Sequence, residues 1–178
     1  MNLCGRTHRY GIKDSSRRQC PRCVRIKENI EKWDKFYLNM AEHVSTASKD
    51  PSTKCGCVIA RPDKTVASVG YNGFPKGMND DPELYADRDY KYDLIVHAEM
   101  NAIIHAKESL KECALYIWPF LTCHRCAKHI IQTGITRIVT SVCPPSKIER
   151  WEPSFKISRQ FFKEAGIEVK EYLLHDEV

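Results

Sequence analysis

Four residues in two short stretches have the chemistry of a metal-dependent catalytic site. His97 and Glu99 stand two positions apart, and Cys123 and Cys126 form a Cys-x-x-Cys pair further along the chain. One imidazole and two thiolates supply three ligands of tetrahedral Zn²⁺ and leave the fourth position open for water. Glu99 is close enough to serve that water without occupying a coordination position. The alternatives are a structural zinc site, a Glu99 that caps a helix and a His97 that lies in the core.

A second group of metal-binding residue types lies near the N-terminus and consists of Cys4, His8, Cys20 and Cys23. Their spacing, Cys-x₃-His-x₁₁-Cys-x₂-Cys, predicts a closed structural zinc site with four protein ligands. Because so short a segment cannot build a hydrophobic core, the metal would supply its folding energy. The alternative is a basic tail that merely contains three cysteines and a histidine.

The N-terminal segment is also strongly basic. Residues 1–27 carry eight Lys or Arg side chains against Asp14 alone, a net charge of +7 in a chain whose total is +5. Such a charge suits a phosphate polyanion such as nucleic acid, or an acidic protein surface. It equally suits a solvated charged face.

The composition is that of a soluble globular protein, with 178 residues of which 42% are hydrophobic and 29% charged. No apolar run approaches the ~18 residues of a membrane-spanning helix. Residues 1–10 lack the apolar core of a signal peptide. We therefore expect a cytoplasmic protein, without membrane association, whose nine cysteines stay reduced and favour metal over disulfides.

Hydrophobic periodicity predicts the elements that must position these residues. Helices are predicted from about Val24 to the Asp50-Pro51 pair, and over Ala98–Lys107, Cys123–Thr133 and Ser154–Ala165. Strands are predicted over Cys55–Ala60, Thr65–Tyr71, Ala114–Trp118, Ile135–Val142 and Ile167–Leu173. Residues 78–93 show no period and are predicted to form a long functional loop. This order of elements predicts a layered α/β domain with helices packed on a mixed sheet.

Several stretches of the chain together resemble the deoxycytidylate deaminase family of the cytidine deaminase-like superfamily. They are Ser48–Gly56, Gly70–Gly77, His97–Ile103, Cys123–Lys128 and the tail from Trp151 to Ile167, and the resemblance covers residues 25–173. It implies a three-layer α-β-α fold around a five-stranded mixed sheet. It also implies a zinc-dependent deaminase domain, which we place in residues 25–178. The small zinc-binding module predicted from the spacing of Cys4, His8, Cys20 and Cys23 lies outside the resemblance, in residues 1–24.

The activity that the resemblance implies is hydrolysis of the amine of a deoxycytidine nucleotide, which converts dCMP to dUMP and ammonia and extends to dCTP. The dUMP would supply thymidylate synthesis. Glu99 would be the catalytic residue, and His97, Cys123 and Cys126 would hold the catalytic Zn²⁺. Substrate-binding positions would be Asn72, Ala98, Thr53, Lys54 and Lys128. The last three are equally typical of ordinary surface residues.

The resemblance further implies a homo-oligomer, commonly a hexamer, that dCTP activates and dTTP inhibits together with Mg²⁺. The effector would lie in the stretch from Gly73 to Asp93. Two positions depart from the family pattern. Thr122 replaces the proline that usually precedes the first cysteine. Ala47 replaces an arginine that often precedes the Ser-x-Asp-Pro segment, which bears on how the substrate phosphate is held.

Two other functions remain as hypotheses. The basic N-terminal zinc module would guide a nucleic-acid cytidine deaminase to its target strand, where the base must be extruded or single-stranded. An acidic, tyrosine-bearing stretch at residues 78–93 argues against this function, because it resembles the effector loop of enzymes that act on free nucleotides. The other hypothesis is an inert binding protein with the same fold, and the intact Glu99 argues against it.

Overall fold

A computed structural model describes residues 21–173, except for the side chains of residues 21–24, 26 and 27. Of the predicted N-terminal zinc ligands, Cys4, His8 and Cys20 lie outside the described residues, and the side chain of Cys23 does too. The described chain forms two units that meet between Phe36 and Tyr37, within helix α1 (Pro21–Ser45). The first unit contains the beginning of α1, and the second contains the end of α1 and every other element.

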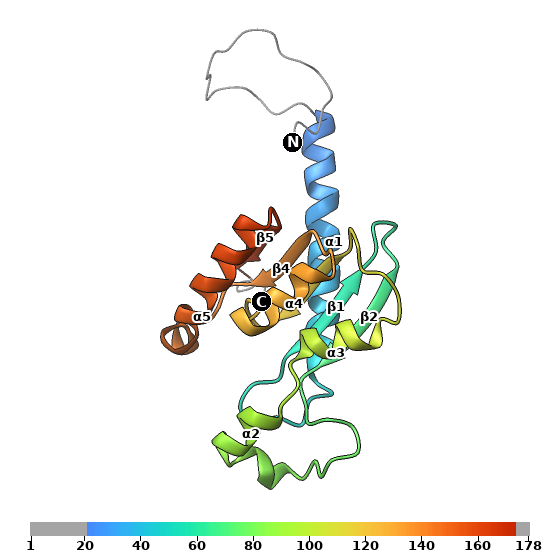
Figure 1. Cartoon of the computed structure of the whole chain (residues 1–178). Coiled ribbons are helices and arrows are strands. Elements are labelled where there is room, and N and C mark those ends of the chain that lie inside the picture. Colours follow the sequence, from blue (N-terminus) through green and yellow to red (C-terminus); the bar gives the residue numbers. More distant parts are fainter. Residues whose placement is uncertain (1–20, 174–178) are drawn as a thin grey trace. The chain divides into compact units, whose positions relative to one another are not determined.

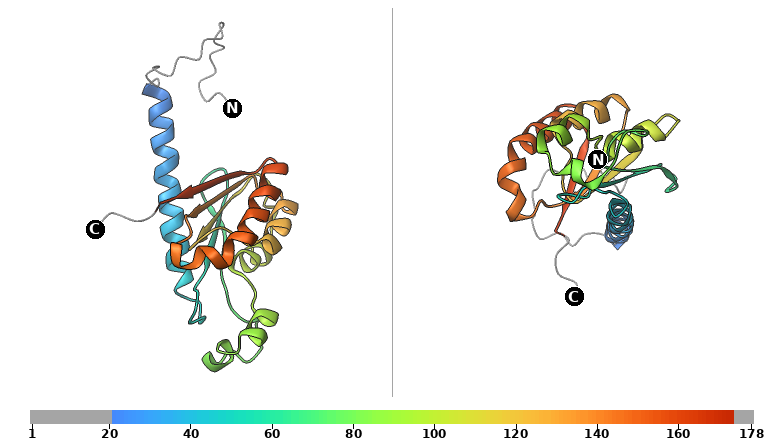
Figure 2. Two further views of the ribbon diagram at one scale, coloured as in Figure 1. Left: turned by 90° about the vertical axis from the view of Figure 1, so that its left-hand side faces the viewer. Right: turned by 90° about the horizontal axis from the view of Figure 1, so that it is seen from below.

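The second unit is a five-stranded mixed sheet with helices on both faces (Figure 1, Figure 2). Its strands are β1 (Gly56–Ala60), β2 (Val66–Tyr71), β3 (Ala114–Trp118), β4 (Arg137–Ser141) and β5 (Glu168–Tyr172), in the order β2-β1-β3-β4-β5. Strand β1 runs antiparallel to both of its neighbours, whereas β3, β4 and β5 are parallel. The helices that follow β2 are η1 (Pro82–Tyr85), α2 (Arg88–Leu94), α3 (Ala98–His105), α4 (His124–Gln132) and α5 (Pro145–Glu164). The predicted three-layer α/β fold with five strands is confirmed.

Two glycines allow helices to approach opposite faces of the sheet closely. A Cβ on Gly56 would lie 2.0 Å from the carbonyl oxygen of Ala41 in α1. A Cβ on Gly70 would lie 2.4 Å from both the carbonyl oxygen of Ala98 and the amide nitrogen of Ala102 in α3. Because Gly70 is paired with Cys57, the residue after Gly56, the two glycines face opposite sides of the sheet. The end of α1 therefore covers one face, and α3 covers the other.

The main hydrophobic core lies between the sheet and helices α3, α4 and α5. Strands β1, β3 and β4 contribute buried residues from alternate positions, which are Cys57, Ile59, Leu115, Ile117 and Ile138. Helices α3, α4 and α5 contribute Ala98, Ala102, Ala127, Ile130, Phe155 and Phe162, all of them inaccessible to solvent. This packing fixes the N-terminal ends of α3 and α4, where the predicted metal ligands lie.

Helix boundaries differ from the prediction at two prolines. Helix α1 ends at Ser45 rather than at Asp50-Pro51, because the hydroxyls of Ser45 and Thr46 donate to carbonyls three positions earlier and close the last turn. Helix α5 begins at Pro145 rather than at Ser154 and continues through Pro153. A proline in the first turn of a helix loses no hydrogen bond, so Pro145 starts α5 instead of preceding a loop.

The prediction that residues 78–93 form a loop is wrong in part, because η1 and α2 lie in this stretch. The side chain of Asp87 caps α2 by accepting hydrogen bonds from the amides of Asp89 and Tyr90. Helix α2 has 7 residues, too few to display a helical period in the sequence.

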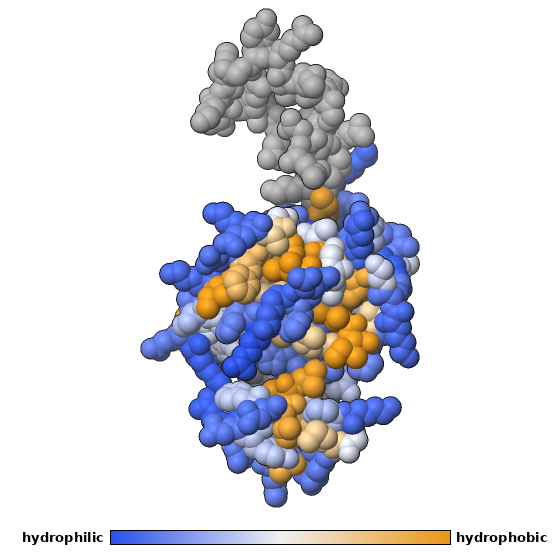
Figure 3. Space-filling model, in the orientation of Figure 1, coloured by the Kyte–Doolittle hydropathy of each residue, from blue (hydrophilic) through white to orange (hydrophobic). Residues whose placement is uncertain are grey.

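Figure 3 shows that polar side chains dominate the face that it draws, with apolar residues gathered in bands between them. Among the described residues, no helix combines the length and the apolar character that a membrane span requires.

Candidate active site

Three of the predicted metal ligands meet at the ends of two adjacent helices. His97 is the residue before α3 and Cys123 the residue before α4, and both have extended backbone angles that aim their side chains at the same point. The Nδ1 atom of His97 lies 3.4 Å from the sulfur of Cys123 and 3.4 Å from the sulfur of Cys126. All three ligand atoms lie within 4.8 Å of one another.

These side chains are electrostatically coupled. A hydrogen bond from Cys126 and the nearby imidazole of His97 lower the pKa of the Cys123 thiol to about 3. The hydrogen bond to Cys123 raises the pKa of His97 to about 9 against the opposing effect of burial. The pKa of Cys126 is raised, because it shares a proton with the Cys123 sulfur and is itself buried. The cluster therefore stabilises a thiolate, which is the form that binds a metal.

The donor set fits Zn²⁺ by its chemistry. One imidazole nitrogen and two sulfurs suit a borderline-soft cation that prefers tetrahedral coordination. Among the residues that the structure describes, no fourth His, Cys, Asp or Glu joins this group. Three protein ligands with an open fourth position are typical of catalytic rather than structural zinc sites.

Glu99 lies in the first turn of α3 and is 4% exposed. Burial raises the pKa of its carboxyl group, while the charge of His97 opposes this effect. A buried carboxyl group with a raised pKa, placed two residues after a metal ligand, suits the transfer of protons to and from a bound substrate.

Helix α5 fixes the segment that carries the cysteine pair. The hydroxyl of Ser158 donates to the carbonyl of Thr122 at 2.8 Å, and the amide of His124 donates to the hydroxyl of Ser154 at 3.1 Å. Thr122 is buried, and it stands where the resembled family usually has proline. The turn into α4 is therefore held by hydrogen bonds from a neighbouring helix.

A cavity that opens to solvent lies beside these residues. His97, Glu99 and Cys123 form one part of its wall. The other lining residues come from five segments and are Asp50, Ser52, Thr53, Cys55, Asn72, Lys91, Tyr92, Ile95, Ala98, Ile117, Phe120, Leu121, Arg150 and Trp151. The walls are thus partly apolar and aromatic, with a few polar and charged groups, as is typical of small-molecule sites.

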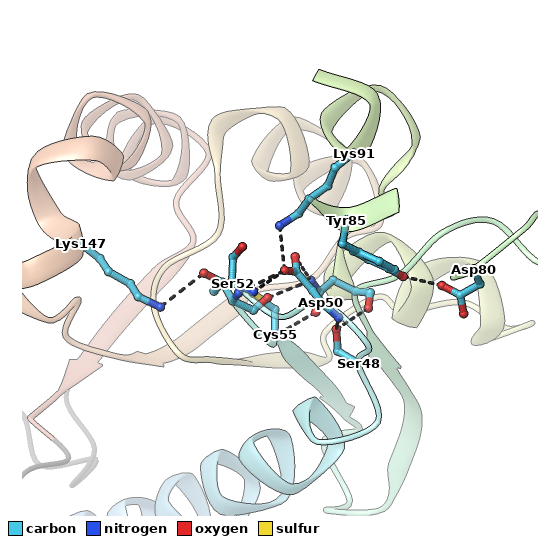
Figure 4. Close-up of polar contacts among 10 residues, drawn as sticks. Ser48, Asp50, Ser52, Cys55, Asp80, Tyr85, Lys91 and Lys147 are labelled. Carbon is cyan, nitrogen blue, oxygen red and sulfur yellow. Dashed lines mark hydrogen bonds and ion pairs between the residues drawn. The ribbon is translucent and has the colours of Figure 1, made fainter. Parts of the chain in front are cut away.

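Asp50 organises the polar side of the cavity (Figure 4). Its Oδ1 accepts from Lys91 Nζ at 2.7 Å and from the amides of Ser52 at 2.8 Å and Thr53 at 3.3 Å. Its Oδ2 accepts from the side-chain amide of Asn72 at 3.3 Å. One buried carboxylate therefore connects α2, the segment after α1 and the end of β2.

The predicted substrate-binding residues fall into two groups. Asn72, Ala98 and Thr53 line the cavity, whereas Lys54 and Lys128 are exposed and lie outside its lining. Both hydrogens of the Asn72 side-chain amide are already donated, to Asp50 and to the carbonyl of Thr53, and its Oδ1 accepts from the amide of Cys55 at 2.7 Å. Only the second lone pair of that oxygen is left for a ligand.

Sequence reasoning missed the cations and aromatic residues that complete the cavity. Lys91 and Tyr92 come from α2, which was predicted as loop, and Arg150 and Trp151 come from the part of α5 that was not predicted as helix. The sequence does contain lysines and arginines in residues 88–91 and 147–150 that could bind a ligand. Without the fold, these residues cannot be distinguished from ordinary surface charges.

Comparison with known proteins agrees with this geometry. Residues 31–142 match the family described as the cytidine and deoxycytidylate deaminase zinc-binding region. An uncharacterized deaminase in the luxG 3′ region of Aliivibrio fischeri is 41% identical over 140 residues, which cover 79% of this chain and 93% of that protein. A probable deoxycytidylate deaminase of Caenorhabditis elegans is 40% identical over 114 residues, which cover 62% of this chain and 57% of that protein.

The fold is similar to that of the dCMP deaminase from the cyanophage S-TIM5. Its apo structure has a TM-score of 0.61 and 20% sequence identity, and the comparison covers 79% of this chain and 98% of that chain. The three-layer architecture is therefore shared at a low level of sequence identity.

Proposed function

Since the chain belongs to the cytidine and deoxycytidylate deaminase family, we propose that it is a zinc-dependent hydrolase that converts dCMP to dUMP and ammonia. The observation that carries this function is the presence of Glu99, His97 and Cys123 in the wall of one cavity, with Cys126 in the same group of potential metal ligands. Relatives named deoxycytidylate deaminase, such as that of Mus musculus, and the S-TIM5 enzyme in complex with dCMP and dUMP support this substrate.

The roles of the chain's own residues follow from their positions. His97, Cys123 and Cys126 would hold Zn²⁺, which when bound lowers the pKa of water and provides a nucleophile near neutral pH. The Glu99 carboxylate accepts a proton from the attacking water and delivers it to N3 of cytosine as oxygen bonds to C4. It then takes the remaining proton from the new C4 hydroxyl group and delivers it to the amino group, so that the C4–N bond breaks, a C4 carbonyl forms and ammonia leaves the uracil ring.

The cavity walls position the base for this transfer. The apolar side chains of Ile117, Phe120 and Leu121 exclude water from one side of the cavity, where the ring would lie. Exclusion of water strengthens the interactions between Glu99 and the ring nitrogen, because the local dielectric constant is low.

Turnover by the purified full-length chain tests this function. We expect ammonia release from dCMP, read by chromatography of dUMP, and a fall in kcat of roughly 10²- to 10⁴-fold in Glu99→Gln with zinc content unchanged. Glu149→Gln, on the exposed surface of α5 and outside the cavity lining, is the matched control and should keep wild-type activity. A kcat for Glu99→Gln close to that of wild type would contradict the mechanism.

The same assay with deoxycytidine, dCTP and single-stranded DNA defines the substrate class. We expect dCMP to be preferred, with dCTP as a second nucleotide substrate, and the dUMP formed to be available for thymidylate synthesis in the cytoplasm. Activity on single-stranded DNA alone would instead indicate a nucleic-acid deaminase that the basic residues 1–27 guide to its substrate.

Regulation by nucleotide effectors is a further part of the proposal. A second cavity is lined by Gly73 to Met78 with Lys49, Tyr71, Asp80, Tyr85, Asn101 and His105. Asn72 lines both this cavity and the candidate active site, so a ligand in one can displace a residue of the other. We expect dCTP to activate and dTTP with Mg²⁺ to inhibit dCMP turnover, and a lack of response to either nucleotide would contradict this part.

Assembly and the N-terminal metal complete the proposal. Strand β2 and helix α3 expose apolar side chains, with Ile104 62% and Val69 44% accessible, and these suit contacts between copies in a homo-oligomer such as a hexamer. Light scattering measures the number of copies.

A second, structural Zn²⁺ would be held near the N-terminus by Cys4, His8, Cys20 and Cys23. Metal analysis of Cys4→Ser should then show one zinc ion fewer per chain than wild type.

A further inference from the structure

Two cations near the beginning of α5 lie at the rim of the candidate active site. Lys147 and Arg150 are three positions apart, so they lie on the same side of the helix. Nζ of Lys147 lies 3.3 Å from the hydroxyl oxygen of Thr53, which lines the cavity, and the Arg150 side chain itself lines the cavity. Figure 4 shows Lys147 extending from α5 toward the segment that contains Ser52.

The guanidinium group of Arg150 is held between two aromatic rings. It lies 5.4 Å from the ring centre of Tyr92 in α2 and 5.4 Å from that of Trp151 in α5. All three side chains line the cavity. Cation–π contacts restrict the orientation of the arginine without using its N–H donors, which stay available to a ligand.

Neither cation forms an ion pair with a carboxylate within residues 28–173. Among the described residues, Arg61, Arg159 and Lys49 each form an ion pair, whereas no ion pair involves Lys147 or Arg150. Lys91, the other cation in the cavity wall, is paired with the buried Asp50. The α5 side of the cavity therefore carries a positive charge, because no acidic residue of the cavity wall pairs with Lys147 or Arg150.

We propose that Lys147 and Arg150 bind the 5′-phosphate of the substrate and so select nucleotides over nucleosides. This inference rests on the proposed function, which places the cytosine ring at Glu99. The single cavity that contains Glu99 also reaches Thr53 and Arg150, so one nucleotide contacts both ends. Arginine binds phosphate through two parallel hydrogen bonds, and lysine adds a point charge.

These two residues also explain how a phosphate is held in a chain with alanine at position 47. Ala47 lines the second cavity and not the candidate active site. Lys54 and Lys128, which the resemblance suggested as substrate-binding residues, are exposed and lie outside the lining. The charge for phosphate binding is instead supplied from α5.

Comparison of dCMP with deoxycytidine tests the proposal. In Lys147→Gln and Arg150→Gln we expect kcat/KM for dCMP to fall roughly 10- to 100-fold, mainly through KM, because each loses a charge-assisted hydrogen bond. The kcat/KM of the two variants for deoxycytidine should equal that of wild type. Lys156→Gln, an exposed lysine of α5 outside the cavity, is the matched control. Equal losses on both substrates, or no loss on dCMP, would overturn the proposal.

Calorimetric binding of dUMP and deoxyuridine to the same variants requires no turnover. We expect wild type to bind dUMP more tightly than deoxyuridine, and the two α5 variants to lose most of that difference. If wild type deaminates nothing but retains this phosphate-dependent binding, the proposed activity fails while the phosphate site stands. A wild-type protein that binds both ligands equally overturns the phosphate site by itself.

Discussion

Nζ of Lys91 lies 2.7 Å from Oδ1 of Asp50, and the two side chains are 6% and 3% accessible to solvent. This ion pair attaches α2 to the segment that leads into β1. The same carboxylate accepts hydrogen bonds from two backbone amides and from Asn72. A buried charge with this many partners is satisfied only while all of them stay in place.

We predict that Lys91→Met lowers the free energy of unfolding by about 3–5 kcal/mol, because it leaves the Asp50 charge buried without its cation. Activity should fall as well, since Asn72 and Thr53 lose their fixed positions. Urea denaturation monitored by circular dichroism measures the first effect. Arg61→Met breaks the more exposed pair with Glu108 and should cost no more than ~1 kcal/mol. Equal costs for the two variants would contradict the assigned role of Lys91.

Replacement of a proposed zinc ligand should remove the metal while the fold is retained. Cys123→Ser is expected to contain one zinc ion fewer per chain than wild type and to lose turnover to background, because a serine hydroxyl is a poor substitute for a thiolate ligand. Cys113→Ser, at a buried core position away from the ligand group, should retain both zinc and activity. Elemental analysis of the purified variants distinguishes these outcomes, and wild-type zinc content in Cys123→Ser would refute the assignment.

A methyl group on Gly70 in β2 should disturb the candidate active site, because it displaces α3, which carries Glu99. In Gly70→Ala the new Cβ meets the backbone of Ala98 and Ala102, so α3 must shift and carry Glu99 with it. We expect a loss of roughly 3 kcal/mol or more in stability, with reduced kcat. At Gly73 the nearest atom to a new Cβ is the Tyr85 hydroxyl at 3.9 Å, so Gly73→Ala should be tolerated. Thermal unfolding of both variants checks the contrast.

The stability contributed by Asp80 should depend on pH. Hydrogen bonds from Tyr85 at 2.6 Å and from Lys49 at 2.9 Å lower the pKa of Asp80 below its ordinary value of 3.8. A lowered pKa stabilises the folded state above the unfolded-state value, and the effect disappears as the pH falls through the folded-state value. Asp80→Asn should therefore be less stable than wild type near neutral pH and approach it in acid.

Denaturant unfolding of wild type and Asp80→Asn over an acidic-to-neutral series measures this difference. Asp81→Asn changes the neighbouring carboxylate and serves as the control. A difference between wild type and Asp80→Asn that persists unchanged below pH 3.8 would show that the carboxylate charge is not its cause.

The candidate metal ligands and Glu99 were predictable because their residue types occur at short, recognisable spacings. His97 with Glu99, and Cys123 with Cys126, each lie within one turn of a helix start, so local sequence contains both the ligands and their approximate directions. The sheet was predictable for a similar reason, since its central strands β1 and β3 are short apolar runs bounded by turn residues.

The rest of the site depends on long-range packing. Lys147 reaches Thr53, which is 94 positions earlier in the chain, and Lys91 reaches Asp50, which is 41 positions earlier. No local pattern distinguishes these lysines from exposed ones such as Lys54 and Lys128. The positions of Lys91 and Lys147 beside the cavity follow only from the packing of α2 and α5 in the folded chain.

The order of the strands has a consequence for aggregation. Strands β2 and β5 form the two edges of the sheet. Strand β5 contains three charged residues among five, whereas the six residues of β2 carry no charge. Because charged side chains at an edge oppose the addition of another strand, only the β2 side favours such an addition. Unlimited stacking into a fibril requires two receptive edges, so this asymmetry limits edge-to-edge growth to a pair of sheets.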